Sequence, residues 1–205
     1  MSHLERLRFR TAGAGDATAV AALHAESWRR HYRGAYSDSF LDGDVVADRE
    51  MIWTERLRIA DGGSYTVVAE GDAGIVGFAH AVFDSDPTWG ALVDNLHVTQ
   101  RHKRRGVGSE LLALIAQAAI EREKPLYLWV LERNVHARAF YEARGAVRVE
   151  RALVAAPGGV KSRLNRTPSK LRYAWSDPTV LLTYRSPIAS DADMSGAVVE
   201  GPRSD

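Results

Sequence analysis

The sequence predicts a mixed α/β domain, and three observations support this fold class. Segments with strand-like and helix-like patterns alternate along the 205 residues. Between Ala91 and Leu131, a strand pattern, a helix pattern and a second strand pattern follow one another, as in a βαβ unit. The last of these, Leu126 to Leu131, is continuously apolar, which is typical of a parallel strand buried on both faces.

The N-terminal half is predicted to contain a strand, two helical regions and a hairpin. Alternation over Leu7 to Arg10 indicates a short strand, and Asp16 is a suitable N-cap for the helix that follows. A second helical region is expected over Asp38 to Arg58. Tyr65 to Ala69 and Gly74 to Phe83 are rich in strand-forming residues, and the Gly and Asp between them favour a hairpin turn.

The C-terminal half is predicted to complete the βαβ unit and add further strands. Ala91 to Val98 indicates a strand, and helical periodicity begins at Gly108. Asn134 is expected to cap a short helix that Gly145 closes. The further expected strands are Val147 to Val154 and Val180 to Tyr184. We expect one domain over residues 1–187, with a basic loop at 155–175, and a disordered Ser-, Asp-, Ala- and Gly-rich tail at 188–205.

Composition excludes several functional classes. The 27 Lys and Arg residues nearly balance 26 Asp and Glu, which argues against a dedicated nucleic-acid-binding protein. Cysteine is absent, so disulfides, thiolate metal sites and a cysteine nucleophile are excluded. No apolar run approaches the roughly 20 residues that span a bilayer, and the first residues lack the apolar segment of a signal peptide. We therefore expect a cytoplasmic protein without a membrane partner.

One segment, Arg151 to Trp175, carries six basic residues and no acidic one. The simplest interpretation is a solvated loop. Alternatives are a flap that meets an anionic cofactor or substrate and, less in keeping with the neutral total charge, a nucleic-acid contact. The six residues are Arg151, Lys161, Arg163, Arg166, Lys170 and Arg172.

A basic, glycine-containing segment between the central strand and helix suggests a phosphate site. It runs Arg101-His102-Lys103-Arg104-Arg105-Gly106-Val107-Gly108-Ser109. Glycines allow a tight turn that points successive N–H groups at one spot, at the positive end of the helix dipole. The segment lacks the Gly-Lys-Ser/Thr of a Walker loop and the third glycine of a dinucleotide fingerprint, where Leu111 stands. A well-capped helix without a ligand would look similar.

Together with the next strand and helix, this segment resembles the GNAT family of acetyl-CoA-dependent N-acetyltransferases. The family's pyrophosphate loop, Arg/Gln-x-x-Gly-x-Gly/Ala, reads here Lys103-Arg104-Arg105-Gly106-Val107-Gly108. Leu96-His97-Val98 stands where the family's fourth strand enters that loop, and the family's next block matches Leu128 to Ala146. The resemblance covers about residues 7–154. It implies a central mixed sheet whose parallel fourth and fifth strands splay apart, with helices on both sides.

The resemblance also implies where acetyl-CoA binds. The pyrophosphate would lie on the N–H groups of Arg104 to Ser109, and the pantetheine arm would lie along the fourth strand. The cofactor residues implied are Leu96, His97, Val98, Lys103, Arg104, Arg105, Gly106, Val107, Gly108, Ser109, Asn134 and Ala137. Asn134 has a structural alternative as an N-cap. Two positions depart from the family pattern, because Lys103 replaces Arg or Gln and Arg104 stands where Gly is common.

For catalysis, the resemblance places Tyr141 as the general acid that protonates the leaving CoA thiolate. A phenol of ordinary pKa is neutral at pH 7 and can make that donation. Asp94 is the candidate general base for the amine, with Glu26 and His97 as weaker alternatives. His24 and His31 lack a third ligand at a suitable spacing, so we expect no metal.

The expected activity is acetyl transfer to a primary amine of a small molecule, by direct attack because no acyl-cysteine can form. Trp28 and Tyr32 are candidate walls of the amine pocket, although packing in the core would suit them equally well. Alternatives are a protein or peptide N-acetyltransferase and a non-catalytic CoA-binding sensor. The resemblance is compatible with a homodimer.

Overall fold

The computed structural model describes residues 7–59 and 62–184, which form one seven-stranded sheet in the order β1-β2-β3-β4-β5-β7-β6. Neighbouring strands are antiparallel except β4 and β5, which are parallel. The expected mixed α/β fold is confirmed. The strands are β1 (Arg8–Thr11), β2 (Ser64–Gly71), β3 (Gly74–Asp86), β4 (Gly90–Val98), β5 (Leu126–Leu131), β6 (Val147–Leu153) and β7 (Ser169–Trp175).

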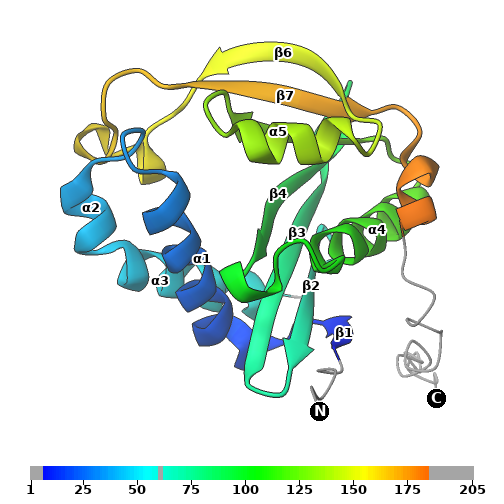
Figure 1. Cartoon of the computed structure of the whole chain (residues 1–205), viewed down its shortest axis with the longest axis horizontal. Helices are drawn as coiled ribbons and strands as arrows, with labels where there is room; N and C mark the ends of the chain where they lie inside the picture. Colours follow the sequence, from blue (N-terminus) through cyan, green and yellow to red (C-terminus); the bar gives the residue numbers. More distant parts are fainter. Residues whose placement is uncertain (1–6, 60–61, 185–205) are drawn as a thin grey trace, which may run out of the picture.

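Helices cover both faces of the sheet (Figure 1). Side chains alternate across a strand, so Val67 and Ala69 pack in the core cluster that includes α4 while Val68 packs with α1 and α3. The helices are α1 (Ala17–His31), α2 (Asp38–Asp42), α3 (Val45–Arg58), α4 (Val107–Ile120) and α5 (Val135–Glu142). The described helices include none that is long and apolar enough to cross a membrane.

The parallel strands β4 and β5 separate soon after they begin. Only Ala91 with Leu126 and Leu92 with Tyr127 are in register, whereas β4 continues along β3 as far as Val98. The two strands therefore diverge toward their carboxyl ends, as the resemblance implied.

Strand β4 also contains a bulge at Asp94. His80 of β3 pairs with Asn95, while the next residue, Ala81, pairs with Val93, so Asp94 has no partner in the register. A bulge bends its strand and changes the direction of nearby side chains, often beside functional sites. Asp94 thus lies where β4 turns away from regular pairing.

The predicted final strand was wrong. Val180 to Tyr184 falls within a 3-10 helix, Pro178–Tyr184, and the last strand is β7, inside the segment that we expected to be a basic loop. In β7, buried Leu171 and Tyr173 alternate with basic residues, a period-two pattern that the charge obscured. The basic side chains are accommodated because Arg172 and Lys170 lie over the ring of Trp129.

Other boundaries were close to the prediction. The helical region Asp38 to Arg58 is two helices, α2 and α3, which are separated at Gly43. Asn134 caps α5 as expected, and Gly145 adopts φ +81°. The predicted tail, 188–205, lies outside the described residues, and the extent of the domain stays a prediction.

The β6–β7 connection, residues 154–168, is bonded to the α1–α2 connection. Ser37 N–H donates to the Arg163 carbonyl at 2.9 Å, and Asn165 N–H donates to the Ala35 carbonyl at 2.8 Å. The Arg163 guanidinium also bonds Asp48 at 2.7 Å, and buried Arg49 pairs with the same carboxylate. Arg163 thus anchors this loop to Asp48 of α3, and Arg49, from α3 itself, also neutralises this buried carboxylate, which would be costly to bury unpaired.

A tight contact at Gly90 determines where β4 begins beside β5. Gly90 has φ +76°, and a Cβ there would lie 2.6 Å from the Pro125 carbonyl oxygen, the same oxygen that accepts from Ala91 N–H. Gly62 has nearly the same φ, +75°, with no atom within 4 Å of a Cβ, and it provides a matched control.

We predict that Gly90→Ala destabilises the protein more than Gly62→Ala does. Both substitutions place a side chain at positive φ, at a cost of about 1–2 kcal/mol. Only Gly90→Ala also displaces Pro125, which adds about 1–3 kcal/mol. Urea unfolding measures both free energies, and equal losses would contradict the role of this contact.

Candidate active site

The divergence of β4 and β5 leads to the first turn of α4. Gly106 precedes this helix with φ +86°, and its carbonyl accepts from Ser109 N–H at 2.9 Å. The N–H groups of Val107 and Gly108 belong to the first turn and so have no carbonyl partner within the helix. These groups and the helix dipole form a place suited to an anion.

Arg104 adopts a backbone conformation in this loop that normally favours glycine. This residue has φ +61°, a left-handed conformation that costs a non-glycine residue about 1–2 kcal/mol. The family's frequent glycine at this position is therefore explained by the backbone. In this protein the strained residue is Arg104, and its side chain is exposed beside the N-terminus of α4.

Two side chains of the loop already have partners. Lys103 Nζ lies 2.9 Å from Nε2 of His31 at the end of α1. Ser109 Oγ accepts from Arg144, whose Nη2 and Nε lie at 2.5 and 3.2 Å. Arg144 also stacks on the Phe140 ring at 3.7 Å. Sequence reasoning missed Arg144, and the available signal was a cation just before Gly145.

Asn134 acts as a helix cap. Its Oδ1 accepts from Ala137 N–H at 3.3 Å, so the structural alternative is confirmed. The cap holds both residues at the end of β5, where the strand has left β4. A role for Asn134 and Ala137 in cofactor binding stays a prediction.

The end of β4 carries the predicted Leu96-His97-Val98 segment. All three residues pair with β3, and their other backbone edge has no partner strand among the described residues. The His97 side chain contacts α1, because its Nδ1 lies 2.8 Å from Ser27 Oγ and its ring lies beside His24. Burial lowers the pKa of His97 to about 3, so its imidazole is neutral at pH 7.

Tyr141 is buried in the main core, where its ring contacts Phe140 and Trp175 edge-on. Burial raises the pKa of its phenol above the ordinary value, and the phenol of Tyr32 adds to this effect. The Tyr141 hydroxyl therefore keeps its proton at neutral pH. A group in this state can act as a proton donor but not as a base.

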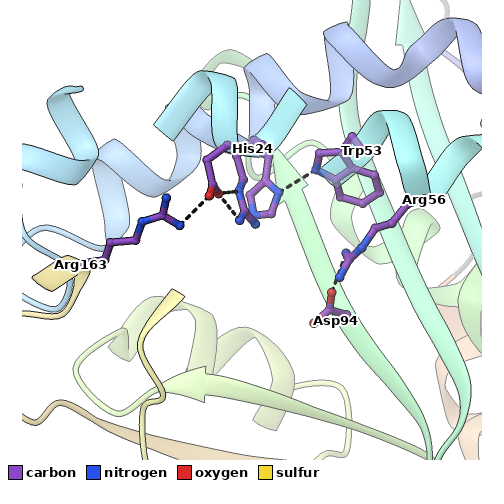
Figure 2. Close-up of polar contacts among 7 residues, drawn as sticks. His24, Trp53, Arg56, Asp94 and Arg163 are labelled. Carbon is purple, nitrogen blue, oxygen red and sulfur yellow. Dashed lines mark hydrogen bonds and ion pairs between the residues drawn. The ribbon is translucent and has the colours of Figure 1, made fainter. Parts of the chain in front are cut away.

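Asp94 is held through one of its two carboxylate oxygens. Oδ2 accepts from Arg56 Nη1 and from Asn95 Nδ2, each at 2.8 Å, and Figure 2 shows Arg56 reaching Asp94 from α3. Oδ1 makes no hydrogen bond within the described part of the chain. The carboxylate is thus oriented, with one oxygen left to accept a proton or a hydrogen bond.

The predicted amine-pocket residues differ in exposure. Trp28 is buried against α2 and stacks with Arg49, so its role in the core is clear. Tyr32 is partly exposed, and its ring contacts those of Trp28 and Tyr36, with centroid distances of 5.3 and 4.8 Å. Burial and nearby Asp94 raise the pKa of Tyr32 to about 12.

Several further charged side chains have structural partners. Asp84 pairs with Lys124, and Asp86 pairs with Arg172. In the basic segment, Arg151 pairs with Glu132 at 2.8 Å, in addition to the Arg163 contact described above. Much of the local charge is therefore neutralised within the molecule.

The two histidines of α1 serve different partners. His24 Nδ1 accepts from Trp53 Nε1 at 2.9 Å (Figure 2), whereas His31 meets Lys103. Residues 7–59 and 62–184 contain no group of three His, Cys, Asp or Glu side chains placed to hold a metal ion.

Comparison with known proteins identifies the family. The model of the acetyltransferase (GNAT) family matches residues 25–146, more than half of the chain. The protein belongs to the GNAT family of acetyltransferases. The matched region contains the diverging strands β4 and β5, the basic segment 101–109 and α5.

Two curated relatives are acetyltransferases. A probable N-acetyltransferase of Mycobacterium tuberculosis is 28% identical over 143 residues, which cover 67% of this chain and 78% of that protein. The mycothiol acetyltransferase of Actinosynnema mirum is 38% identical over 96 residues, 46% of this chain. The match spans only 31% of that enzyme.

Solved structures share the fold. The PaiA N-acetyltransferase of Thermoplasma acidophilum, in complex with coenzyme A, has a TM-score of 0.63 and 14% identity, covering 83% of this chain and 99% of that one. Arabidopsis thaliana NAA60, in complex with acetyl-CoA, has a TM-score of 0.59 and 14% identity, covering 83% and 98%.

The buried histidines predict a loss of stability in mild acid. Burial lowers the pKa of His80 to about 4, that of His97 to about 3 and that of His24 well below normal. Below about pH 6.5 the unfolded chain binds protons that the folded protein does not. The free energy of unfolding should therefore fall from about pH 6.5 toward 4, by up to about 1.4 kcal/mol per pH unit for each histidine.

Urea unfolding between pH 7.5 and 5 measures this slope. His80→Gln should reduce the slope of the free energy of unfolding against pH by the contribution of one histidine. His136→Gln, at an exposed position, should leave this slope near the wild-type value. Identical slopes for wild type and His80→Gln would contradict the prediction.

Proposed function

We propose that the protein transfers the acetyl group of acetyl-CoA to a primary amine of a small molecule, by direct attack in a ternary complex. The observation that carries the proposal is the divergence of β4 from β5 beside the free first turn of α4. This arrangement offers an unpaired strand edge and an anion site next to each other. The coenzyme A and acetyl-CoA complexes named for the PaiA and NAA60 structures support the same cofactor.

The residues at the divergence fit a pyrophosphate and a pantetheine arm. The N–H groups of Val107 and Gly108 would bind the pyrophosphate, with loop cations nearby. Gly108 lies against Phe140, and a Cβ there would make an ordinary contact at 3.6 Å, in keeping with the Gly or Ala of the family. The β4 edge at Leu96 and Val98 and the Asn134 side chain would pair with the arm, and Val98 N–H would polarise the thioester carbonyl.

In the proposed reaction, the amine nitrogen attacks the thioester carbonyl carbon and the carbon–sulfur bond breaks. The proton leaving the amine passes to Asp94 Oδ1, directly or through water. The Tyr141 phenol donates its proton to the departing thiolate. The buried, protonated Tyr141 and the one-sided anchoring of Asp94 support these roles.

Two structural features and one relative favour a small acceptor over a peptide. The bonds between residues 154–168 and the α1–α2 connection close one side of the region beside Tyr32. An open pocket of about 490 Å³ lies between α3 and the strands β2 and β3, and its lining includes Arg56, the partner of Asp94. The activity named for the mycothiol acetyltransferase is also acetylation of a small molecule. A cytoplasmic location and a homodimer remain part of the proposal.

The direct test combines cofactor binding with a panel of amines. Acetyl-CoA should raise the melting temperature by mass action, and thiol release should identify the amines that are acetylated. No shift at acetyl-CoA concentrations far above the micromolar range would overturn the cofactor assignment. Binding with turnover only on peptides would favour a protein acetyltransferase, and binding without turnover would favour a sensor.

Tyr141→Phe should lower kcat by about 10²–10⁴-fold, because it removes the acid that protonates the leaving thiolate. Acetyl-CoA affinity should change little, since the ring and its packing remain. Tyr65→Phe removes a phenol on β2, which is separated from β4 by β3, and should retain wild-type kcat. Steady-state thiol release measures both variants, and an unchanged kcat in Tyr141→Phe would contradict the acid role.

A further inference from the structure

The contact between Lys103 and His31 joins the phosphate loop to the end of α1. Lys103 Nζ lies 2.9 Å from His31 Nε2, although 72 residues separate them in the chain. Both side chains are half-buried. The His31 carbonyl also accepts from Arg133 Nη2 at 3.4 Å, so the last turn of α1 is attached to the end of β5 as well.

The chemistry of this contact specifies the state of the imidazole. An ammonium has only donors, so His31 Nε2 must supply a lone pair and its proton must lie on Nδ1. Burial and the charge of Lys103 lower the pKa of His31, which favours this neutral form. Burial and nearby Arg30 lower the pKa of Lys103, while Glu26 opposes them.

Lysine at position 103 depends more than arginine would on a neighbouring residue to hold its charged group in place. Arginine offers a planar fork that engages phosphate at two points, whereas lysine carries a point charge on a flexible chain of four carbons. A flexible cation loses side-chain entropy when a ligand immobilises it. If another residue already restrains the ammonium, less of that entropy remains to be lost on binding.

We propose that His31 is a positioning residue that holds the Lys103 ammonium beside the phosphate loop, ready for the pyrophosphate of acetyl-CoA. This inference rests on the proposed function. His31 compensates for the lysine that replaces the family's arginine or glutamine. It also connects cofactor binding to the helix turn that carries Tyr32, the next residue in the chain.

The test compares a ligand that contains the pyrophosphate with one that lacks it. Isothermal titration or steady-state KM is measured with acetyl-CoA and with S-acetyl-pantetheine for wild type, His31→Leu, His31→Gln and Lys103→Met. His31→Leu should weaken acetyl-CoA about fivefold to tenfold, with kcat little changed. S-acetyl-pantetheine should be unaffected, because it has no phosphate for Lys103 to meet.

Two further variants separate positioning from simple structural support. His31→Gln offers an amide oxygen as acceptor and should recover most of the affinity. In a Lys103→Met background, His31→Leu should cause no additional loss, because the residue that it positions is gone. His31→Leu protein is compared only after its circular dichroism and melting temperature match the wild type. If it does not fold, the Gln and Lys103→Met variants still carry the test.

Several results would overturn the inference. Wild-type acetyl-CoA affinity in His31→Leu, equal loss for both ligands, or additive losses in the double variant would each do so. If His31→Leu does not fold, the inference would be overturned by a loss of acetyl-CoA affinity in His31→Gln or by unchanged affinity in Lys103→Met. Failure of wild type to bind acetyl-CoA at all would instead remove the proposed function. The wild-type titration therefore distinguishes the two failures.

Discussion

The early separation of β4 and β5 is the constraint on which the rest of the site depends. Parallel strands normally remain paired along their length, yet here only two residue pairs are in register. The close contact between Gly90 and Pro125 defines where the pairing of β4 with β5 begins. The bulge at Asp94 lies just beyond the last residue of β4 that pairs with β5. The result is a strand edge without a partner beside a helix N-terminus, which a uniform sheet could not provide.

The distribution of charged residues matters more for this protein than its net charge. The formal net charge is only +1, and acids such as Asp86 and Asp48 neutralise bases of the segment from Arg151 to Trp175. By contrast, Arg104 remains exposed beside the first turn of α4, in a backbone conformation that glycine would adopt at lower cost. The proposed phosphate site would come from the placement of cations and N–H groups, without an excess of base over the whole chain.

Local patterns in the sequence allowed much of the fold to be predicted. The βαβ unit, the cap at Asn134 and the turn at Gly106 each depend on residues within a few positions of one another. The error at β7 has a physical cause. Lys170 and Arg172 suggested a solvated loop, but the ring of Trp129 provides a surface on which both cations pack. Sequence periodicity cannot reveal that partner, because it lies on another strand.

Local sequence patterns were sufficient to predict the fold class and the family, and they led us to propose a phosphate loop between β4 and α4. These features are encoded by hydrophobic periodicity and by glycines whose backbone conformation the loop requires. Which side chains meet depends on the tertiary structure: Lys103 contacts His31, Asp94 contacts Arg56, and Ser109 contacts Arg144. Such partners are 35 to 72 residues apart. Their contacts arise from how helices pack on a splayed sheet, and no local pattern specifies that packing.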